Sequence, residues 1–169
     1  MTFDIPETEP NSELEKVYKT VGFIAVNWGM CEIALDSIIV LIFNNFKGHK
    51  FLDRRPSNLQ QKLKLLRDCF KEFSEFKELQ LESDTLFQSY ENIGKRRNDI
   101  IHSLIDDYSQ NDKFIFLKID VIPKVRHKAR SVVLSDLDWS ILSKELQDLM
   151  KDSTRLLVKV FNKCSKNII

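Results

Sequence analysis

The longest pattern of apolar and polar positions lies in the first third of the chain. At the roughly 100° per residue of an α-helix, its apolar positions form one continuous stripe. The members of this stripe are Val17, Val21, Ile24, Trp28, Leu35, Ile39, Ile42 and Phe46. Ser12, followed by Glu15 three residues later, makes a capping box at its start. We therefore expect one helix from Ser12 to about Phe46.

The same segment has a second apolar strip, almost opposite the first, made of Phe23, Met30, Ala34 and Leu41. A helix that is apolar on two sides either lies centrally in its domain or shares one side with a partner subunit. The sequence leaves both open. The segment is nearly long enough to span a membrane, but Glu32 and Asp36 in its middle would each cost about 2.5–3.5 kcal/mol there. We therefore expect a soluble helix and no membrane partner.

Two shorter helical patterns follow a loop at residues 47–56. Ser57 and Gln60 form a capping box at the start of the first pattern. The stripe of that second predicted helix is Leu59, Leu63, Leu66, Phe70 and Phe73. The stripe of the third predicted helix is Leu86, Phe87, Tyr90, Ile93, Ile101, Leu104 and Ile105.

The periodicity changes after residues 106–107. Residues 114–119 and 131–134 are rich in aromatic and β-branched side chains, and Pro123 lies in the basic connection between them. This pattern favours two short strands paired as an antiparallel hairpin. Ser135 and Asp136 then cap a last helix. Its apolar side comprises Leu142, Leu146, Leu149, Leu156, Leu157, Val160, Phe161 and Cys164.

Composition supports a mainly α protein. The 169 residues suffice for one domain with a sizeable core, and four Gly and four Pro leave little room for a turn-rich sheet protein. Residues 1–11 read as a flexible N-terminal tail, and residues 12–169 as a single domain. We predict a helical bundle of about four helices with a small β-hairpin inserted before the last helix.

Net charge and cysteine positions limit the possible partners and the cellular compartment of the protein. The net charge is +1, so nucleic-acid binding would need a local basic cluster rather than a global field. Cys31, Cys69 and Cys164 each fall in an apolar helical pattern, which predicts buried thiols in a reducing compartment. The first dozen residues are acidic, unlike the basic start of a signal peptide. We expect a cytoplasmic protein.

Arg97 is the main anomaly of the third predicted helix. Tyr90, Ile93 and Ile101 lie within about 40° of it around the helix axis, so it falls in the middle of an apolar stripe. Lys95 and Arg96 point elsewhere and are expected on the surface. Glu32 is similarly misplaced on the first helix, about 40° from Trp28. We hypothesise that Glu32 accepts hydrogen bonds from Arg97; a buried ion pair that only sets helix register is the alternative.

Asn98 and His102 form an i, i+4 pair at the edge of the stripe that contains Arg97. A single His near an apolar face is more often a satisfied rim residue than a catalyst. His49 and His127 lie in predicted loops and share no helical spacing with His102, and no carboxylate cluster has the order of a metal site. We therefore expect no metal and no other cofactor.

The run Arg97-Asn98-Asp99-Ile100-Ile101-His102 resembles the motif of the HEPN superfamily, an Arg and a His separated by four to six residues, with a polar residue directly after the Arg. The expected context is similar: a long first helix with Trp28 and Glu32, then the motif helix, a short β insertion and a last long helix. As architecture, the resemblance covers roughly residues 14–165. As sequence, it is specific over about ten residues.

The resemblance implies a metal-independent RNA endonuclease of the toxin or defence type. It implies a homodimer in which two motifs face each other across a shared cleft, with RNA as substrate and an antitoxin or another protein as partner. His102 would be the general acid and base, Arg97 would bind the scissile phosphate, and Asn98 would orient the site. These roles suit the groups, because an imidazole titrates near neutral pH and a guanidinium forks onto phosphate oxygens.

The β insertion carries a basic tip that could steer an RNA strand. The candidate RNA-binding residues are Lys124, Arg126, Lys128 and Arg130. A solvated loop is the plainer interpretation of this cluster. Asp106 and Asp107, which follow the motif, would repel an RNA backbone if they lined the cleft.

Two other functional classes stay open. Many HEPN proteins are not catalytic, so the chain would alternatively be a HEPN-like domain that binds nucleotides, RNA or protein, with Arg97 and Glu32 in structural roles. A plain helical dimerisation protein is the third interpretation.

Overall fold

The computed structural model describes residues 12–46, 50–51, 54–109, 113–120 and 128–166. The helices are α1 (Ser12–Asn45), α2 (Leu59–Glu72), the 3₁₀ helix η2 (Ser74–Leu79), α3 (Gln80–Ile101) and α4 (Asp136–Lys166). The strands are β1 (Leu104–Ser109), β2 (Lys113–Asp120) and β3 (Lys128–Ser135). The predicted fold class is confirmed in the described part: four α-helices, with antiparallel strands inserted before the last of them. The predicted tail at residues 1–11 lies outside the described residues.

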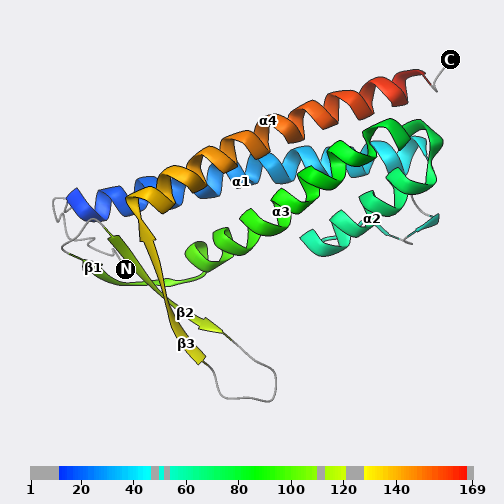
Figure 1. The fold of residues 1–169 in the computed structure, drawn as a ribbon. Helices are drawn as coiled ribbons and strands as arrows, with labels where there is room; N and C mark the ends of the chain where they lie inside the picture. The colour runs from blue at the N-terminus through cyan, green and yellow to red at the C-terminus, as the bar shows by residue number, and fades with distance from the viewer. Residues whose placement is uncertain (1–11, 47–49, 52–53, 110–112, 121–127, 167–169) are drawn as a thin grey trace, which may run out of the picture.

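The long helices α1 and α4 lie side by side and run in the same direction, while α3 runs back beneath them (Figure 1). Near the start of both long helices, Phe23 and Trp139 meet edge to face with ring centroids 5.3 Å apart. At the opposite end of α1, Phe46 packs against Phe76 of η2 at 4.7 Å, and Phe70 of α2 stacks on the same Phe76 at 5.0 Å. Aromatic contacts therefore close the core at both ends of α1.

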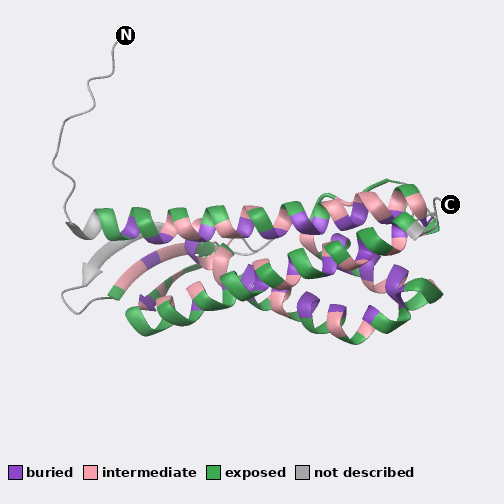
Figure 2. Ribbon diagram, turned by 90° about the horizontal axis from the view of Figure 1, so that it is seen from above, coloured by how far each residue is buried: buried purple, intermediate pink, exposed green. Residues whose placement is uncertain are grey.

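Buried positions recur along each helix between exposed ones, as expected for amphipathic helices around one core (Figure 2). Tyr90 of α3 lies fully buried at the centre of this core. Its hydroxyl donates to the carbonyl oxygen of Cys31 at 2.6 Å and lies 2.8 Å from the hydroxyl of Ser153. Burial raises the pKa of Tyr90, and the neutral phenol joins α1, α3 and α4 through hydrogen bonds. Cys31, Cys69 and Cys164 are all buried free thiols, as predicted.

The two apolar strips of α1 have different surroundings. The main stripe packs into the core, where Ile24, Leu35 and Ile42 have no exposed surface. The second strip is divided: Ala34 is buried, whereas Met30 is 53% exposed. By length and composition alone, Glu15–Asn45 would suit a membrane span, with a mean hydropathy of 1.7, but a buried core helix passes the same test.

The starts of α2 and α4 differ in detail from the prediction. At α2 the cap is Asn58, whose side-chain oxygen accepts from the backbone N–H of Gln61 at 2.9 Å, so the predicted box of Ser57 and Gln60 is one residue early. At α4 Ser135 is the cap, as predicted, but its partner is Asp138 rather than the predicted Asp136, which is the first residue of the helix. The backbone N–H of Asp138 donates to the hydroxyl of Ser135 at 3.2 Å, and that of Ser135 donates to Asp138 at 3.1 Å. The Ser135 hydroxyl also donates to the Asp138 carboxylate, at 2.5 Å, and the hydrogen bonds from this hydroxyl and from the Ser135 backbone N–H lower the pKa of Asp138.

The inserted sheet has the order β1-β2-β3, with both pairs antiparallel (Figure 1). Two of its strands match the predicted hairpin, and Phe116 pairs with Val132 across them. The strand β1 was not predicted. The helix predicted to reach Ile105 ends at Ile101, and Leu104 begins β1, opposite Leu117 of β2. The turn out of α3 brings the sheet close to the C-terminal end of that helix.

Candidate functional site

Arg97, Asn98 and His102 come together in the last turn of α3. Nη1 of Arg97 donates to Oδ1 of Asn98 at 2.8 Å and lies 3.3 Å from Nε2 of His102. A guanidinium can only donate, so Nε2 of the imidazole is the acceptor in this contact. The predicted catalytic residues therefore form one hydrogen-bonded cluster.

His102 is exposed because the helix ends there. It is the C-cap of α3, with φ −102° and ψ 23°. Its backbone N–H still bonds to the carbonyl oxygen of Asn98 at 3.3 Å, and the next N–H, of Ser103, reaches that of Ile100 at the same distance. The chain then leaves for β1. The imidazole consequently stands at a helix end, open to solvent on the side away from the core.

Arg97 is half-buried beneath this exposed imidazole. Its Cζ lies 6.0 Å from the centroid of the Trp28 ring, at the outer limit of a cation–π contact. Its Nε is buried without a hydrogen-bond partner in the described part of the chain. Buried donors are almost always paired in folded proteins, so the unpaired Nε is an exception in a side chain that is otherwise hydrogen-bonded through Nη1.

The expected pairing of Glu32 with Arg97 is not formed. Neither a hydrogen bond nor an ion pair joins the two described side chains, and Arg97 uses Asn98 and His102 as acceptors instead. The aromatic ring of Trp28, one turn earlier on α1, supplies the surface under the guanidinium. Glu32 is half-buried beside Cys31. Burial raises the pKa of the Cys31 thiol to about 12, and the charge of Glu32 adds to that rise.

Asp99, in the middle of the motif, ties the helix end to the sheet. Its Oδ1 pairs with Nζ of Lys118 on β2 and, at 2.6 Å, with Nη2 of Arg130 on β3. Nε of Arg130 also donates to Asp120 at 2.9 Å. Partial burial alone would raise the pKa of Asp99, but the hydrogen bonds from Lys118 and Arg130 outweigh it, and that pKa is lowered. Sequence spacing could not indicate this network, because its members lie on three separate elements.

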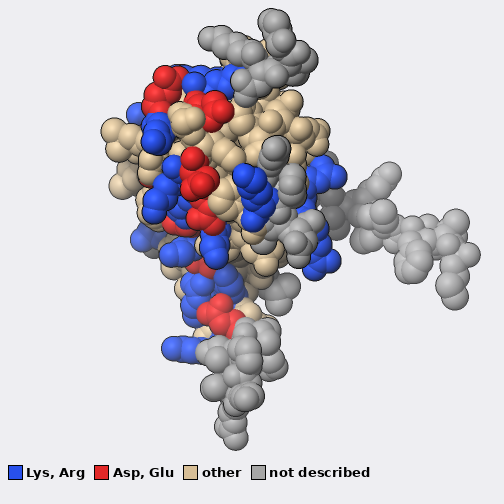
Figure 3. Space-filling model, turned by 90° about the vertical axis from the view of Figure 1, so that its right-hand side faces the viewer, with Lys and Arg blue, Asp and Glu red and all other residues tan. Residues whose placement is uncertain are grey.

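The candidate RNA-binding cluster is only partly described. Lys124 and Arg126 lie outside the described residues, and Lys128 is exposed at the start of β3. Arg130 is engaged by two carboxylates through Nε and Nη2, which offset its charge. On the face seen in Figure 3, Lys and Arg side chains are interspersed with Asp and Glu.

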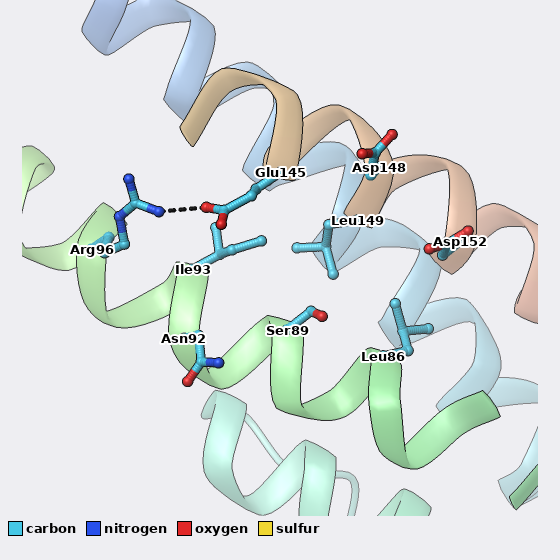
Figure 4. Close-up of a pocket in the computed structure, with 9 residues that line it drawn as sticks. All are labelled: Leu86, Ser89, Asn92, Ile93, Arg96, Glu145, Asp148, Leu149 and Asp152. Atoms are coloured by element: carbon cyan, nitrogen blue, oxygen red, sulfur yellow. Dashed lines mark hydrogen bonds and ion pairs between the residues drawn. The ribbon is translucent and has the colours of Figure 1, made fainter. Parts of the chain in front are cut away.

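A separate hollow of about 200 Å³ lies between α3 and α4 (Figure 4). Arg96 bridges the two helices at its edge, pairing with Glu145 and donating to the carbonyl oxygen of Asp138 at 3.3 Å. The expectation of a plain surface charge at Arg96 is thus corrected to an interhelical contact. The lining residues are Leu86, Ser89, Asn92, Ile93, Arg96, Glu145, Asp148, Leu149 and Asp152, and the Arg97 cluster is not among them.

Metal ligation finds no support among the described residues, where no three His, Cys, Asp or Glu side chains are grouped closely enough to share an ion. No protein-family model, curated protein or solved structure matches the chain significantly. The candidate site rests on its own geometry.

Proposed function

We propose that the protein is a metal-independent RNA endonuclease, with Arg97, Asn98 and His102 as its cleavage centre. The observation that carries the proposal is the contact of Arg97 Nη1 with both Asn98 and His102 at the exposed end of α3. A general base, a phosphate-binding cation and an orienting amide are the groups that transesterification of RNA needs.

The reaction follows from these groups. A phosphate oxygen of the substrate replaces the imidazole as acceptor for the Arg97 guanidinium, which frees His102 Nε2. That nitrogen takes the proton of the ribose 2′-hydroxyl, and the 2′-oxygen attacks phosphorus. The bond to the 5′-oxygen breaks, and this oxygen leaves with a proton. The products are a 2′,3′-cyclic phosphate and a 5′-hydroxyl.

The leaving oxygen needs an acid at the moment that His102 acts as base. Among the described residues, a single chain contributes one imidazole to the cluster, that of His102. We assign the acid to His102 of a second copy facing the first, as the HEPN resemblance implies. An antitoxin or another protein that covers the exposed His102 would keep such a nuclease inactive in the cytoplasm.

Cleavage of a generic labelled RNA in the presence of EDTA tests the proposal. Wild-type protein should give 2′,3′-cyclic phosphate ends. His102→Ala and Arg97→Ala should each lower the rate by about 10²–10⁴-fold. Lys95→Ala is the matched control, because it removes an exposed cation from the same helix turn. Unchanged cleavage by His102→Ala would assign the activity to another protein in the preparation.

A mixing experiment separates the composite site from a single-chain site. When an excess of His102→Ala protein is added to a fixed amount of wild type, a composite site loses activity, because mixed dimers hold one His102 instead of two. Independent single-chain sites would keep the wild-type activity. A wild-type protein that binds RNA or nucleotide without cleaving it would favour the second candidate, a non-catalytic HEPN-like binding domain. The observation in favour of that candidate is that Arg97 already has internal partners and lies half-buried.

A further inference from the structure

The solvent-facing side of α1 is apolar over most of its length. Val26, Met30 and Ile33 are 64%, 53% and 68% exposed, and no Lys, Arg, Asp or Glu occurs between Lys19 and Glu32. Scattered apolar side chains are normal on a protein surface, whereas a contiguous uncharged strip along a helix is typical of an interaction site. We therefore expect this strip to bind a partner.

The strip continues into a groove of about 610 Å³ between the second halves of α1 and α4. Val158 and Phe161 of α4, each more than half exposed, form its far wall. Asp36 is the charged member of the described lining, and it is already paired with Lys62 of α2 at 2.7 Å. The groove therefore presents apolar surface without an unpaired charge to attract an ionic ligand.

Two glycines on the same side of α1 have no explanation within one chain. A Cβ atom added at Gly22 or at Gly29 would meet nothing within 4 Å. Glycine in a helix interior costs stability relative to alanine, and nothing in the described fold requires these two positions to lack a side chain. The backbone of a helix from another molecule would explain the glycines, because positions without a side chain let two helices come close.

The arrangement along α1 is self-complementary. Taking Gly22 as the origin, Gly29, Ile33 and Val40 lie within about 20° of it around the helix axis. A two-fold axis level with residue 31 would place Gly29 opposite Ile33 of an antiparallel copy, and Gly22 opposite Val40. Each glycine in the first half of the strip then faces a branched side chain from the second half of the other copy. A closed two-fold dimer needs this isologous fit.

We infer that the outer side of α1, with the groove against α4, is the surface through which two copies of this chain associate in antiparallel fashion. From Tyr18 to Val40 the strip is about 35 Å long, and the groove widens it toward the roughly 800 Å² per copy of a standard interface. A lipid surface fits less well, because glycines add little apolar area for burial in lipid.

This interface is independent of the proposed nuclease. Trp28, which lies beneath Arg97, is about 120° around α1 from Gly22. Association through the strip therefore does not bring two His102 side chains together. A composite nuclease site would use a second surface, and the two contacts together would give a tetramer.

Light scattering coupled to size exclusion, over a series of protein concentrations, tests the inference. The wild type should have at least twice the mass of one chain. Ile33→Asp should halve that mass and raise the dissociation constant at least about thirtyfold, because the substitution enters a two-fold interface twice. Leu81→Asp is the matched control, since Leu81 is a more exposed apolar residue on another helix, and it should leave the mass unchanged.

A second variant guards against simple misfolding. Gly29→Leu places a side chain where the single chain has open space, so helical circular dichroism and thermal stability should be kept while the mass halves. A monomeric wild type, an unchanged mass in Ile33→Asp, or equal effects of Ile33→Asp and Leu81→Asp would overturn the inference. Flotation of a monomeric wild type with anionic vesicles, lost in Ile33→Asp, would also overturn it and assign the strip to a membrane surface.

Discussion

The guanidinium of Arg97 lies over the indole of Trp28, with Cζ 6.0 Å from the ring centroid. The same indole meets Tyr90 edge to face at 5.9 Å, so one aromatic side chain supports both the candidate site and the core. The position of the guanidinium is set by apolar packing on α1 as much as by hydrogen bonds on α3.

Replacing Trp28 with Leu should therefore affect stability and site together. Loss of the buried ring should lower the free energy of unfolding by roughly 2–4 kcal/mol. Trp28→Phe should lower it less, because a smaller ring still packs against Tyr90. Urea denaturation measures both. Equal losses for the two variants would contradict a role for the aromatic ring.

Gly94 and Gly29 should respond oppositely to the same substitution. A Cβ atom at Gly94 would lie 3.0 Å from Cη2 of Trp28 and 3.2 Å from Cδ2 of Leu59. Since Trp28 is buried, Gly94→Ala should destabilise the protein by about 1–3 kcal/mol. Gly29→Ala meets open space and should stabilise the monomeric fold by up to about 1 kcal/mol. Thermal unfolding at low protein concentration compares them. A stabilised Gly94→Ala would show that the indole can move aside.

The Asp99 network should make stability depend on acid pH. Hydrogen bonds from Lys118 and Arg130 lower the pKa of Asp99 below its usual 3.8. The stabilisation is therefore fully present above that usual value and is lost as the pH falls through the lowered folded pKa. Asp99→Asn should cost about 1–2 kcal/mol at pH 7 and progressively less below about pH 4. Unfolding of both proteins across this range gives the comparison. A difference that does not vary with pH would mean that the Asp99 charge is irrelevant.

The hydroxyl of Tyr90 should contribute more to the free energy of unfolding than the hydroxyl of Ser153. Tyr90→Phe leaves the buried carbonyl oxygen of Cys31 without this donor and removes a partner of Ser153. It should cost about 1–3 kcal/mol. Ser153→Ala leaves the bond from Tyr90 to Cys31 in place, so its cost should be smaller. Chemical denaturation of the two variants tests the order, and a larger loss for Ser153→Ala would reverse the assignment.

Periodicity predicted most of the helices and both strands of the hairpin, because their apolar stripes are long and regular. It failed where the chain changes direction without a Gly or Pro. Ile101, Leu104 and Ile105 continue a helical spacing, but the helix ends at His102 and the last two residues begin β1. Pairing of Leu104 with Leu117 is a long-range contact that local sequence does not reveal.

The site was predictable as far as it is local. Arg97, Asn98 and His102 lie within one and a half turns, so helix geometry alone places them together. Glu32 was chosen because an acidic residue seemed necessary to offset Arg97. In the structure, the ring of Trp28, the Asn98 side chain and the His102 imidazole surround the guanidinium instead. Charge matching overlooked the aromatic alternative.

The pairing of α1 with α4 joins the first and last helices of the chain (Figure 1). During synthesis α1 emerges before α4, and so does Phe23 before its partner Trp139. Closing so long a loop is entropically costly and slow. The core stripe of α1 consequently stays uncovered by α4 until α4 itself has been synthesised, so the growing chain carries exposed apolar surface on α1 during that interval.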